Sequence, residues 1–204
     1  MTVVVWDIGN VLLEWQPRAY FARRMGAART DAFFAAVDLD AANLAVDAGG
    51  PFPATIRALA QDHPDWAEPI GWWCDDWLAL CAPVIGRSVR LLEALHARDV
   101  RCHALTNFGR ETFAMARAAH PFLRLFDGAT VSAHLGVVKP DPAIYAAVEA
   151  ATGAAPGDLL FTDDRADNVA AAAARGWRTH LFDGAEGWAA RLVAEGLLPA
   201  AAAR

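Results

Sequence analysis

Short apolar segments, partly made of β-branched residues, recur along the chain and predict β-strands. They show little polar alternation, which is typical of strands that are buried on both faces of a parallel sheet. Each segment has the length of a single strand. The five predicted strands are Thr2–Trp6, Val100–Leu105, Ala129–Ser132, Leu159–Thr162 and Arg178–Phe182.

Helical periodicity separates the last four of these strands. The predicted helices are Glu111–Ala119, Asp141–Ala151 and Asp167–Arg175, and Gly176 ends the third. Strands that alternate with helices of this length imply right-handed crossovers and a parallel sheet with helices on both faces. The predicted fold class is therefore α/β, with a doubly wound, five-stranded, Rossmann-like parallel sheet.

Residues 16–84 interrupt this alternation. They show helical periodicity in several short pieces, separated by residues 49–53 and by His63–Pro64, and contain no convincing strand. The stretch is too long for a simple crossover, so we predict a helical cap inserted after the first strand, over the carboxyl edge of the sheet. Residues 1–15 and 85–204 would then form the catalytic core and residues 16–84 the cap. Trp72, Trp73 and Trp77 are interpreted as its hydrophobic seam.

Composition limits the possible partners and compartments. The net charge is −6 and the basic residues are scattered, which argues against nucleic acid as a partner. No apolar run approaches membrane-spanning length and no basic segment precedes the first one, so we expect a cytoplasmic protein without membrane association. Cys74, Cys81 and Cys102 lack metal or disulfide spacing and are interpreted as packing residues. Both a monomer and a homodimer are compatible with these observations.

Two residue types are scarce, and their positions are informative. Lys139 is the only lysine among eighteen basic residues, and the chain has four asparagines. Three of these, Asn10, Asn107 and Asn168, fall at the ends of predicted strands or in the loops that follow, as does Lys139. We therefore expect these residues to have specific roles.

Four strand ends each carry a polar group, and the carboxyl ends of parallel strands lie at one edge of a sheet. Crowded carboxylates resist ionisation unless a cation neutralises them, and oxygen ligands without nearby histidine or cysteine favour Mg²⁺. A lysine supplies a compact positive charge suited to a phosphoryl group. A threonine and free backbone N–H groups at the following helix would bind an anion. The polar groups are Asp7, Thr106 with Asn107, Lys139, and Asp163 with Asp164.

These residues resemble, in order and spacing, the four motifs of the haloacid dehalogenase superfamily of hydrolases. Asp7 with Asn10 resembles the first motif, Thr106 the second, Lys139 the third, and Asp163-Asp164 with Asn168 the fourth. The resemblance covers nearly the whole chain, and the helical insertion resembles the small α-helical, C1-type cap of that family. It implies a hydrolase, and among these hydrolases a phosphatase is favoured.

The resemblance also implies a mechanism. Asp7 would attack phosphorus and form an aspartyl-phosphate that water then hydrolyses. Mg²⁺ would be bound by Asp7, the backbone carbonyl of Gly9 and Asp164, with Asp163 binding directly or through water, while Asn168 would order this loop. The residues expected to bind the substrate phosphate are Asn10, Thr106, Asn107 and Lys139, of which Thr106 and Lys139 would also stabilise the transferring group.

Gly9 departs from the usual pattern, in which a second aspartate protonates the leaving oxygen and later activates water. Loss of a general acid typically costs about 10²–10⁴-fold in rate, so we expect a preference for activated esters such as anomeric sugar phosphates or acyl phosphates. The sequence resembles a bacterial subgroup with glycine here that includes an α-D-glucose-1-phosphate phosphatase. Glu14 is a possible replacement acid, although a solvated surface carboxylate is the simpler interpretation. Arg18, Arg23 and Arg24 are candidate cap contacts to substrate, although the solvated face of a helix explains them equally well.

Two alternatives to a Mg²⁺-dependent sugar phosphate or small-metabolite phosphatase stay open. One is a 2-haloacid dehalogenase, in which the same aspartate displaces halide without metal. The adjacent acids Asp163 and Asp164 argue against it, because without a metal they would repel an anionic haloacid. The other is a non-catalytic phosphate-binding protein that kept the fold and lost turnover together with the missing acid.

Overall fold

The computed structural model describes residues 1–202 and contains a five-stranded parallel sheet with the strand order β3-β2-β1-β4-β5. The order reverses direction beside β1, as in a doubly wound α/β fold, so the predicted fold class is confirmed. Every neighbouring pair of strands is parallel. The strands are β1 (Val3–Trp6), β2 (Cys102–Thr106), β3 (Gly128–Val131), β4 (Leu159–Asp163) and β5 (Arg178–Leu181).

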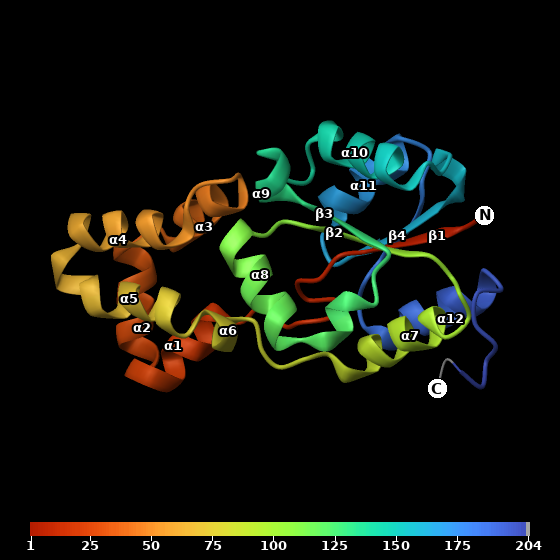
Figure 1. The fold of residues 1–204 in the computed structure, drawn as a ribbon. Coiled ribbons are helices and arrows are strands. Elements are labelled where there is room, and N and C mark those ends of the chain that lie inside the picture. The colour runs from red at the N-terminus through yellow and green to blue at the C-terminus, as the bar shows by residue number, and fades with distance from the viewer. Residues whose placement is uncertain (203–204) are drawn as a thin grey trace.

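Helices cover both faces of this sheet (Figure 1). Val4 and Trp6 of β1 point to the face covered by α7, α8 and α12, whereas Val3 and Val5 point to the face covered by α10 and α11. Successive residues of one strand thus enter two separate apolar clusters, which explains the uninterrupted apolar sequence of β1. These helices are α7 (Gly86–His96), α8 (Arg110–Ala119), α10 (Pro142–Thr152), α11 (Ala166–Ala174) and α12 (Ala185–Ala194).

The predicted strands and helices form with shifts of one or two residues at their ends. One prediction is wrong at its boundary: Ser132 was expected to end the third strand, but it begins the short helix α9 (Ser132–Leu135). Its hydroxyl accepts from the backbone N–H of Phe108 at 3.0 Å, so this side chain joins the loops that follow β2 and β3.

Between β1 and α7 the chain is helical and lies beyond the carboxyl ends of the strands, at the left of Figure 1. Helix α3 packs against α9, and α4 and α6 pack against α8. Trp73 and Trp77 are buried and Trp72 packs against the same cluster, as expected for a hydrophobic seam. The helices are α1 (Pro17–Met25), α2 (Ala27–Ala36), α3 (Leu39–Asp47), α4 (Phe52–Asp62), α5 (Ala67–Asp75) and α6 (Trp77–Leu80).

The two connections between this helical segment and the sheet run side by side. Leu13 and Val84 form an antiparallel bridge, and Glu14 donates its backbone N–H to the carbonyl of Pro83 at 3.0 Å. The division into a core and a cap at these connections stays a prediction. Short 3-10 helices complete the fold at Pro64–Trp66, Pro121–Arg124 and Pro156–Asp158. Within residues 1–202, no helix is long and apolar enough to cross a bilayer.

Candidate active site

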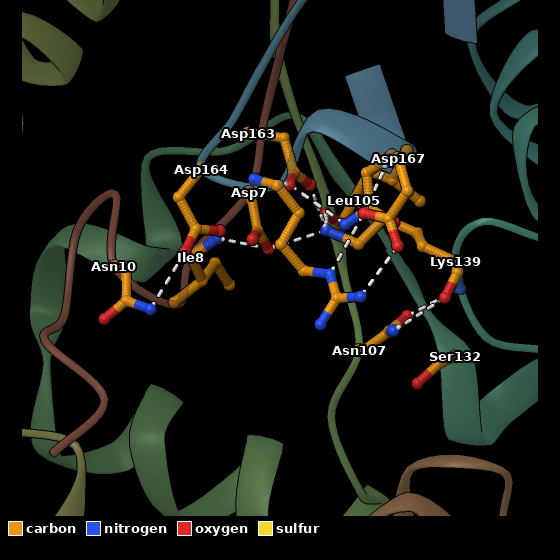
Figure 2. A network of polar contacts seen from close by, with 12 residues as sticks. Asp7, Ile8, Asn10, Leu105, Asn107, Ser132, Lys139, Asp163, Asp164 and Asp167 are labelled. Carbon is orange, nitrogen blue, oxygen red and sulfur yellow. Dashed lines mark hydrogen bonds and ion pairs between the residues drawn. The ribbon is translucent and has the colours of Figure 1, made fainter. Parts of the chain in front are cut away.

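The carboxyl ends of three adjacent strands bring the predicted site residues together. Asp7 follows β1 directly, β2 ends at Thr106 and β4 ends at Asp163. In the sheet β1 lies between β2 and β4, and Trp6 is in register with both Ala104 and Thr162. Figure 2 shows Asp7, Asp163, Asp164 and Lys139 converging at this edge.

Lys139 lies at the centre of the polar network and is buried at the floor of the site, with 1% of its side chain exposed. Its Nζ is 2.8 Å from Asp7 Oδ1 and 2.7 Å from Asp163 Oδ2, and it donates to the carbonyl of Leu105 at 3.0 Å. Burial alone would lower the pKa of Lys139, but the carboxylates of Asp7 and Asp163 outweigh this and raise the pKa. The ammonium group therefore keeps its charge although the side chain is buried.

Asp163 contacts Lys139 through an ion pair and does not line the pocket. Its Oδ1 accepts from the backbone N–H of Arg165 and from Asn168 Nδ2, both at 2.9 Å, and Oδ2 contacts Lys139. The side chain is completely buried. Since both oxygens already have partners within the protein, the observed role of Asp163 is to position Lys139; direct contact with a metal stays a prediction.

Asn10 joins the first and fourth motif segments. Its Nδ2 donates to Asp164 Oδ2 at 2.9 Å, and its Oδ1 accepts from the backbone N–H of Trp15 at 2.9 Å. The backbone of Asn10 is left-handed, with φ of 53°, a conformation that asparagine tolerates better than most residues. Local backbone and side-chain bonding together explain why an asparagine occupies this turn.

The other two asparagines singled out by their scarcity also connect separate segments. Asn107 Oδ1 accepts from the backbone N–H of Lys139 at 2.8 Å, and its Nδ2 donates to the Lys139 carbonyl at 3.2 Å. Asn168 donates to Asp163 from the first turns of α11. Each therefore positions one of the charged residues of the site.

The acidic cluster has the composition and spacing of a site for a hard divalent cation. One carboxylate oxygen from each of Asp7, Asp163 and Asp164 lies within 4.8 Å of the others. Burial raises the pKa of Asp7 to about 7; Lys139 opposes this shift, and the charges of Asp163 and Asp164 add to it. A cation bound among these oxygens would relieve this repulsion, so the donor set fits Mg²⁺. The contribution of the Gly9 carbonyl stays a prediction.

A pocket of about 550 Å³ opens above this cluster. Among the residues described, its lining includes every residue assigned to one of the four motifs or to the metal site, except Asp163. It is also lined by Leu13, Trp15, Asp40, Asn43, Leu44, Asp47, Trp77, Cys81, Phe108 and Arg165. A smaller cavity of about 230 Å³ lies beside the beginnings of β1, β2 and β3, away from all predicted site residues.

The expected anion site at the start of the helix after Asn107 is only partly present. Helix α8 begins at Arg110, and the intervening N–H group of Phe108 donates to Ser132 Oγ at 3.0 Å, so this group is already used within the protein. The N–H group of Gly109 is close enough to Asp47 to oppose the rise in the pKa of that carboxyl group. Thr106 and Asn107 themselves line the pocket, and their phosphate-binding roles stay predictions.

Asp47, at the end of α3, is a pocket residue that the sequence pattern did not reveal. Its Oδ2 accepts from Asn43 Nδ2 at 2.9 Å. Burial raises the pKa of Asp47 to about 7; the Gly109 N–H and Lys139 oppose the shift, and the negative charge of Asp7 adds to it. In the sequence this residue is one of many acids on helical segments, and only the packing of α3 over the sheet edge brings it into the pocket.

The cap arginines considered as substrate contacts do not line the pocket. Arg18 lies 3.5 Å from Asp31 and stacks on Phe34, and Arg24 pairs with Asp76. Arg18 and Arg24 are thus paired on the surface of the helical segment, and Arg23 is exposed and also outside the pocket lining, so of the two explanations considered the solvated helix face agrees with the structure.

Glu14 is likewise outside the set of pocket residues. Its carboxylate accepts a hydrogen bond from the side chain of Gln16, next to the paired connections between the helical segment and the sheet. The structure therefore does not support Glu14 as the replacement acid.

The comparisons with known proteins agree with this geometry. A family model for haloacid dehalogenase-like hydrolases matches residues 1–176. The sesquiterpene phosphatase astK of Aspergillus oryzae is 34% identical over 104 residues, which are 50% of this chain and 53% of that protein. The chain thus spans about half the length of this curated relative.

Solved structures share the fold at lower identity. A haloacid dehalogenase family enzyme of Bacteroides thetaiotaomicron has a TM-score of 0.72 and 19% identity, covering 94% of this chain and 98% of its own. That enzyme has also been solved with magnesium and inorganic phosphate. The L-2-haloacid dehalogenase of Xanthobacter autotrophicus has a TM-score of 0.62 and 20% identity, covering 98% and 85%. The family model, which spans most of the chain, is decisive: the protein belongs to the haloacid dehalogenase-like hydrolases.

Proposed function

We propose that this hydrolase cleaves phosphomonoesters with Mg²⁺ and uses Asp7 as its nucleophile. The observation that carries the proposal is the contact of Lys139 with both Asp7 and Asp163 inside a cluster of three carboxylates. Such a cluster needs a cation, and a cation together with a fixed ammonium group suits a phosphoryl group. The complex of the Bacteroides enzyme with magnesium and phosphate supports the same chemistry.

The bonding of Asp7 leaves one oxygen for attack. Its Oδ1 accepts from the backbone N–H of Ile8 at 2.7 Å and contacts Lys139, so Oδ2 is the candidate nucleophilic oxygen. Attack transfers the phosphoryl group to Asp7, and water then hydrolyses the aspartyl-phosphate. Lys139 and Thr106 would stabilise charge on the transferring oxygens. Mg²⁺, when bound by Asp7 and Asp164, would neutralise the carboxylates and bind the phosphate.

The remaining pocket wall favours an uncharged organic group on the ester. Leu13, Trp15, Leu44, Trp77 and Phe108 line the pocket away from the carboxylates. Lys139 and Arg165 are the cations among its described lining residues, which is few for a polyanionic substrate. The similarity to a sesquiterpene phosphatase supports including apolar esters beside sugar phosphates among the candidates.

Dehalogenation is less well supported, although a dehalogenase shares the fold. Asp164 and Asp47 both face the pocket, together with Asp7. An anionic haloacid without a metal would meet several carboxylates, against the lining cations Lys139 and Arg165. A phosphate that arrives with Mg²⁺ does not meet this repulsion.

A metal-dependent phosphatase screen tests the proposal. We expect hydrolysis of p-nitrophenyl phosphate, glucose 1-phosphate or a prenyl monophosphate that requires Mg²⁺ and is lost in Asp7→Asn. Activity that survives this substitution or chelation contradicts the mechanism. Chloride release from 2-chloropropionate would favour the dehalogenase, and Mg²⁺ binding without turnover of any ester would favour a binding protein.

A further inference from the structure

The pocket contains a carboxyl group that the proposed phosphatase mechanism does not use. We infer that Asp47, carried by helix α3, is the general acid and base that replaces the aspartate missing at Gly9. This inference rests on the proposed function.

Gly9 leaves the side of the pocket nearest the nucleophile open. A Cβ atom built on Gly9 would meet no atom within 4 Å. The backbone is therefore not packed in a way that requires glycine. Because glycine carries no acid, the proton for the leaving group has to come from another residue that lines the pocket.

Asp47 lies at the end of α3 and lines the same pocket as Gly9 and Asp7. Its carboxylate is oriented by Asn43 Nδ2, which donates to Oδ2 at 2.9 Å, and the backbone N–H of Gly109 is close enough to act on its pKa. Gly109 lies three residues beyond Thr106, in the loop that follows β2. The end of α3 therefore lies against the loop that is expected to bind the phosphate.

The close approach of α3 to this loop depends on a glycine. A Cβ atom at Gly109 would lie 2.4 Å from Val46 Cγ1, closer than packed atoms allow. Val46 is buried and immediately precedes Asp47. Glycine at 109 therefore lets the end of α3 pack against the catalytic loop and places the Asp47 carboxyl in the pocket.

The electrostatic setting suits a group that both gives and takes a proton. Burial raises the pKa of Asp47 to about 7, so both forms are accessible near neutral pH. The charged groups that act on it are Asp7, which raises the pKa, and Lys139, which lowers it. The other charged residues that line the pocket are Asp40, Asp164 and Arg165.

Other carboxylates fit the role less well. Glu14 pairs with Gln16 outside the pocket lining, and Asp164 is bonded to Asn10 within the metal cluster. Asp40 lines the pocket, but it lies exposed in the first turn of α3, where an acidic side chain stabilises the helix. Asp47 combines a pocket position with partial burial and a hydrogen bond from Asn43 that fixes its carboxylate.

The chemical step balances with this assignment. As an Asp7 oxygen forms its bond to phosphorus, the bond from phosphorus to the ester oxygen breaks, and the proton of Asp47 passes to that oxygen, which leaves as the alcohol. In the second step the Asp47 carboxylate takes a proton from water as the water oxygen attacks phosphorus. Phosphate leaves, and Asp7 and protonated Asp47 are regenerated.

The test compares esters whose leaving groups need different amounts of protonation. In Asp47→Asn we expect kcat/KM for an alkyl phosphate to fall about 10²–10⁴-fold, whereas kcat/KM for p-nitrophenyl phosphate changes little. A burst of p-nitrophenolate should precede slow turnover, because the second step has lost its base. Asp62→Asn is the matched control, since Asp62 also ends a helix of this segment but is exposed and outside the pocket lining.

A rescue variant separates chemistry from folding. Gly9→Asp, added to Asp47→Asn, should restore alkyl phosphate hydrolysis at least tenfold, because the space at Gly9 accepts a side chain. Equal losses for both esters in Asp47→Asn, no loss for either, or the selective loss in Asp40→Asn instead would overturn the inference. If the wild type hydrolyses p-nitrophenyl phosphate and Asp7→Asn does not, the proposed function holds whatever Asp47 does. Absence of wild-type turnover overturns both.

Discussion

Lys139 and Asp163 form a buried ion pair, with Lys139 Nζ 2.7 Å from Asp163 Oδ2. Neither side chain has more than 1% of its surface exposed. The pair joins the loop beyond β3 to the end of β4 and fixes the ammonium group beside Asp7. Because water cannot replace a missing partner here, the pair has consequences for stability as well as for catalysis.

Removal of the Lys139 charge should strongly destabilise the metal-free protein. Lys139→Met leaves Asp7 and Asp163 buried without a cation, and breaking a buried pair in this way typically costs about 3–5 kcal/mol. Urea unfolding in the presence of a chelator measures the effect. Arg18→Met is the control, since the exposed pair of Arg18 with Asp31 should contribute no more than about 1 kcal/mol. Equal losses in both variants would contradict the expectation.

Loss of the Asn10 amide should weaken Mg²⁺ binding about 10–100-fold, because Asn10 orients the proposed ligand Asp164. Two variants distinguish the loss of this hydrogen bond from strain in the backbone of residue 10. Asn10→Gly accepts the left-handed φ of 53°, whereas Asn10→Ala adds strain to the loss of the amide. Calorimetric titration with Mg²⁺ should therefore show a similar loss of affinity in both, and urea unfolding should show a larger loss of stability in Asn10→Ala than in Asn10→Gly, because both lose the bond to Trp15 but only alanine is strained. Wild-type affinity in Asn10→Gly would show that the hydrogen bond does not support the metal site.

The sequence predicts the strand-end residues well for a physical reason. Parallel strands place their carboxyl ends at one edge, so Asp7, Thr106 and Asp163 can be brought together from strand positions alone. The scarcity of lysine and asparagine added Lys139 and Asn107, which the structure shows bonded to each other. These relationships follow from sheet topology and depend little on side-chain packing.

Residues outside the sheet were harder to place. Asp47 enters the pocket because Gly109 admits Val46 at close range, a tertiary contact that leaves no periodic signal in either segment. Arg18 has the charge expected of a substrate contact, but α1 directs it to Asp31. Ser132 continues an apolar run, yet its side-chain bond to Phe108 accompanies the change from strand to helix.

Stability should fall on acidification partly because of His103, a buried strand residue. Burial, and secondarily the charge of Arg101, lower the pKa of His103 to about 4, while Asp127 opposes the shift. The unfolded histidine has a pKa near 6.5, so between pH 6.5 and 4 the unfolded chain binds more protons and stability falls as the pH falls. This contribution should amount to about 2 kcal/mol between pH 7.5 and 5.

Urea unfolding of the wild type and of His103→Gln at these two pH values isolates the contribution, because all other groups are common to both proteins. Glutamine can still bond to Thr130, the present partner of the imidazole at 2.9 Å. The variant should lose less stability than the wild type on acidification. Equal losses would show that His103 titrates normally in the folded protein.

Gly109→Ala should reduce activity by displacing α3, since the added methyl group would overlap Val46 and would lie 3.0 Å from Thr112 Oγ1. Moving α3 outward takes Asp47 away from the pocket but leaves Asp7, Lys139 and Asp164 in place. We therefore expect Mg²⁺ affinity close to that of the wild type and a loss of alkyl phosphate turnover like that of Asp47→Asn.

Gly71→Ala is the control for this substitution, because a Cβ atom at Gly71, inside α5, would meet no atom within 4 Å. Replacing glycine by alanine within a helix should stabilise the protein by about 0.5–1 kcal/mol and leave turnover unchanged. Steady-state kinetics with alkyl and aryl phosphates, together with urea unfolding, distinguish the two variants. If Gly109→Ala kept full alkyl phosphatase activity, the close packing of α3 would not be needed for catalysis. A parallel loss of Mg²⁺ affinity would instead show that the substitution disturbs the strand-end site itself, because α3 supplies none of the carboxylates of the metal cluster.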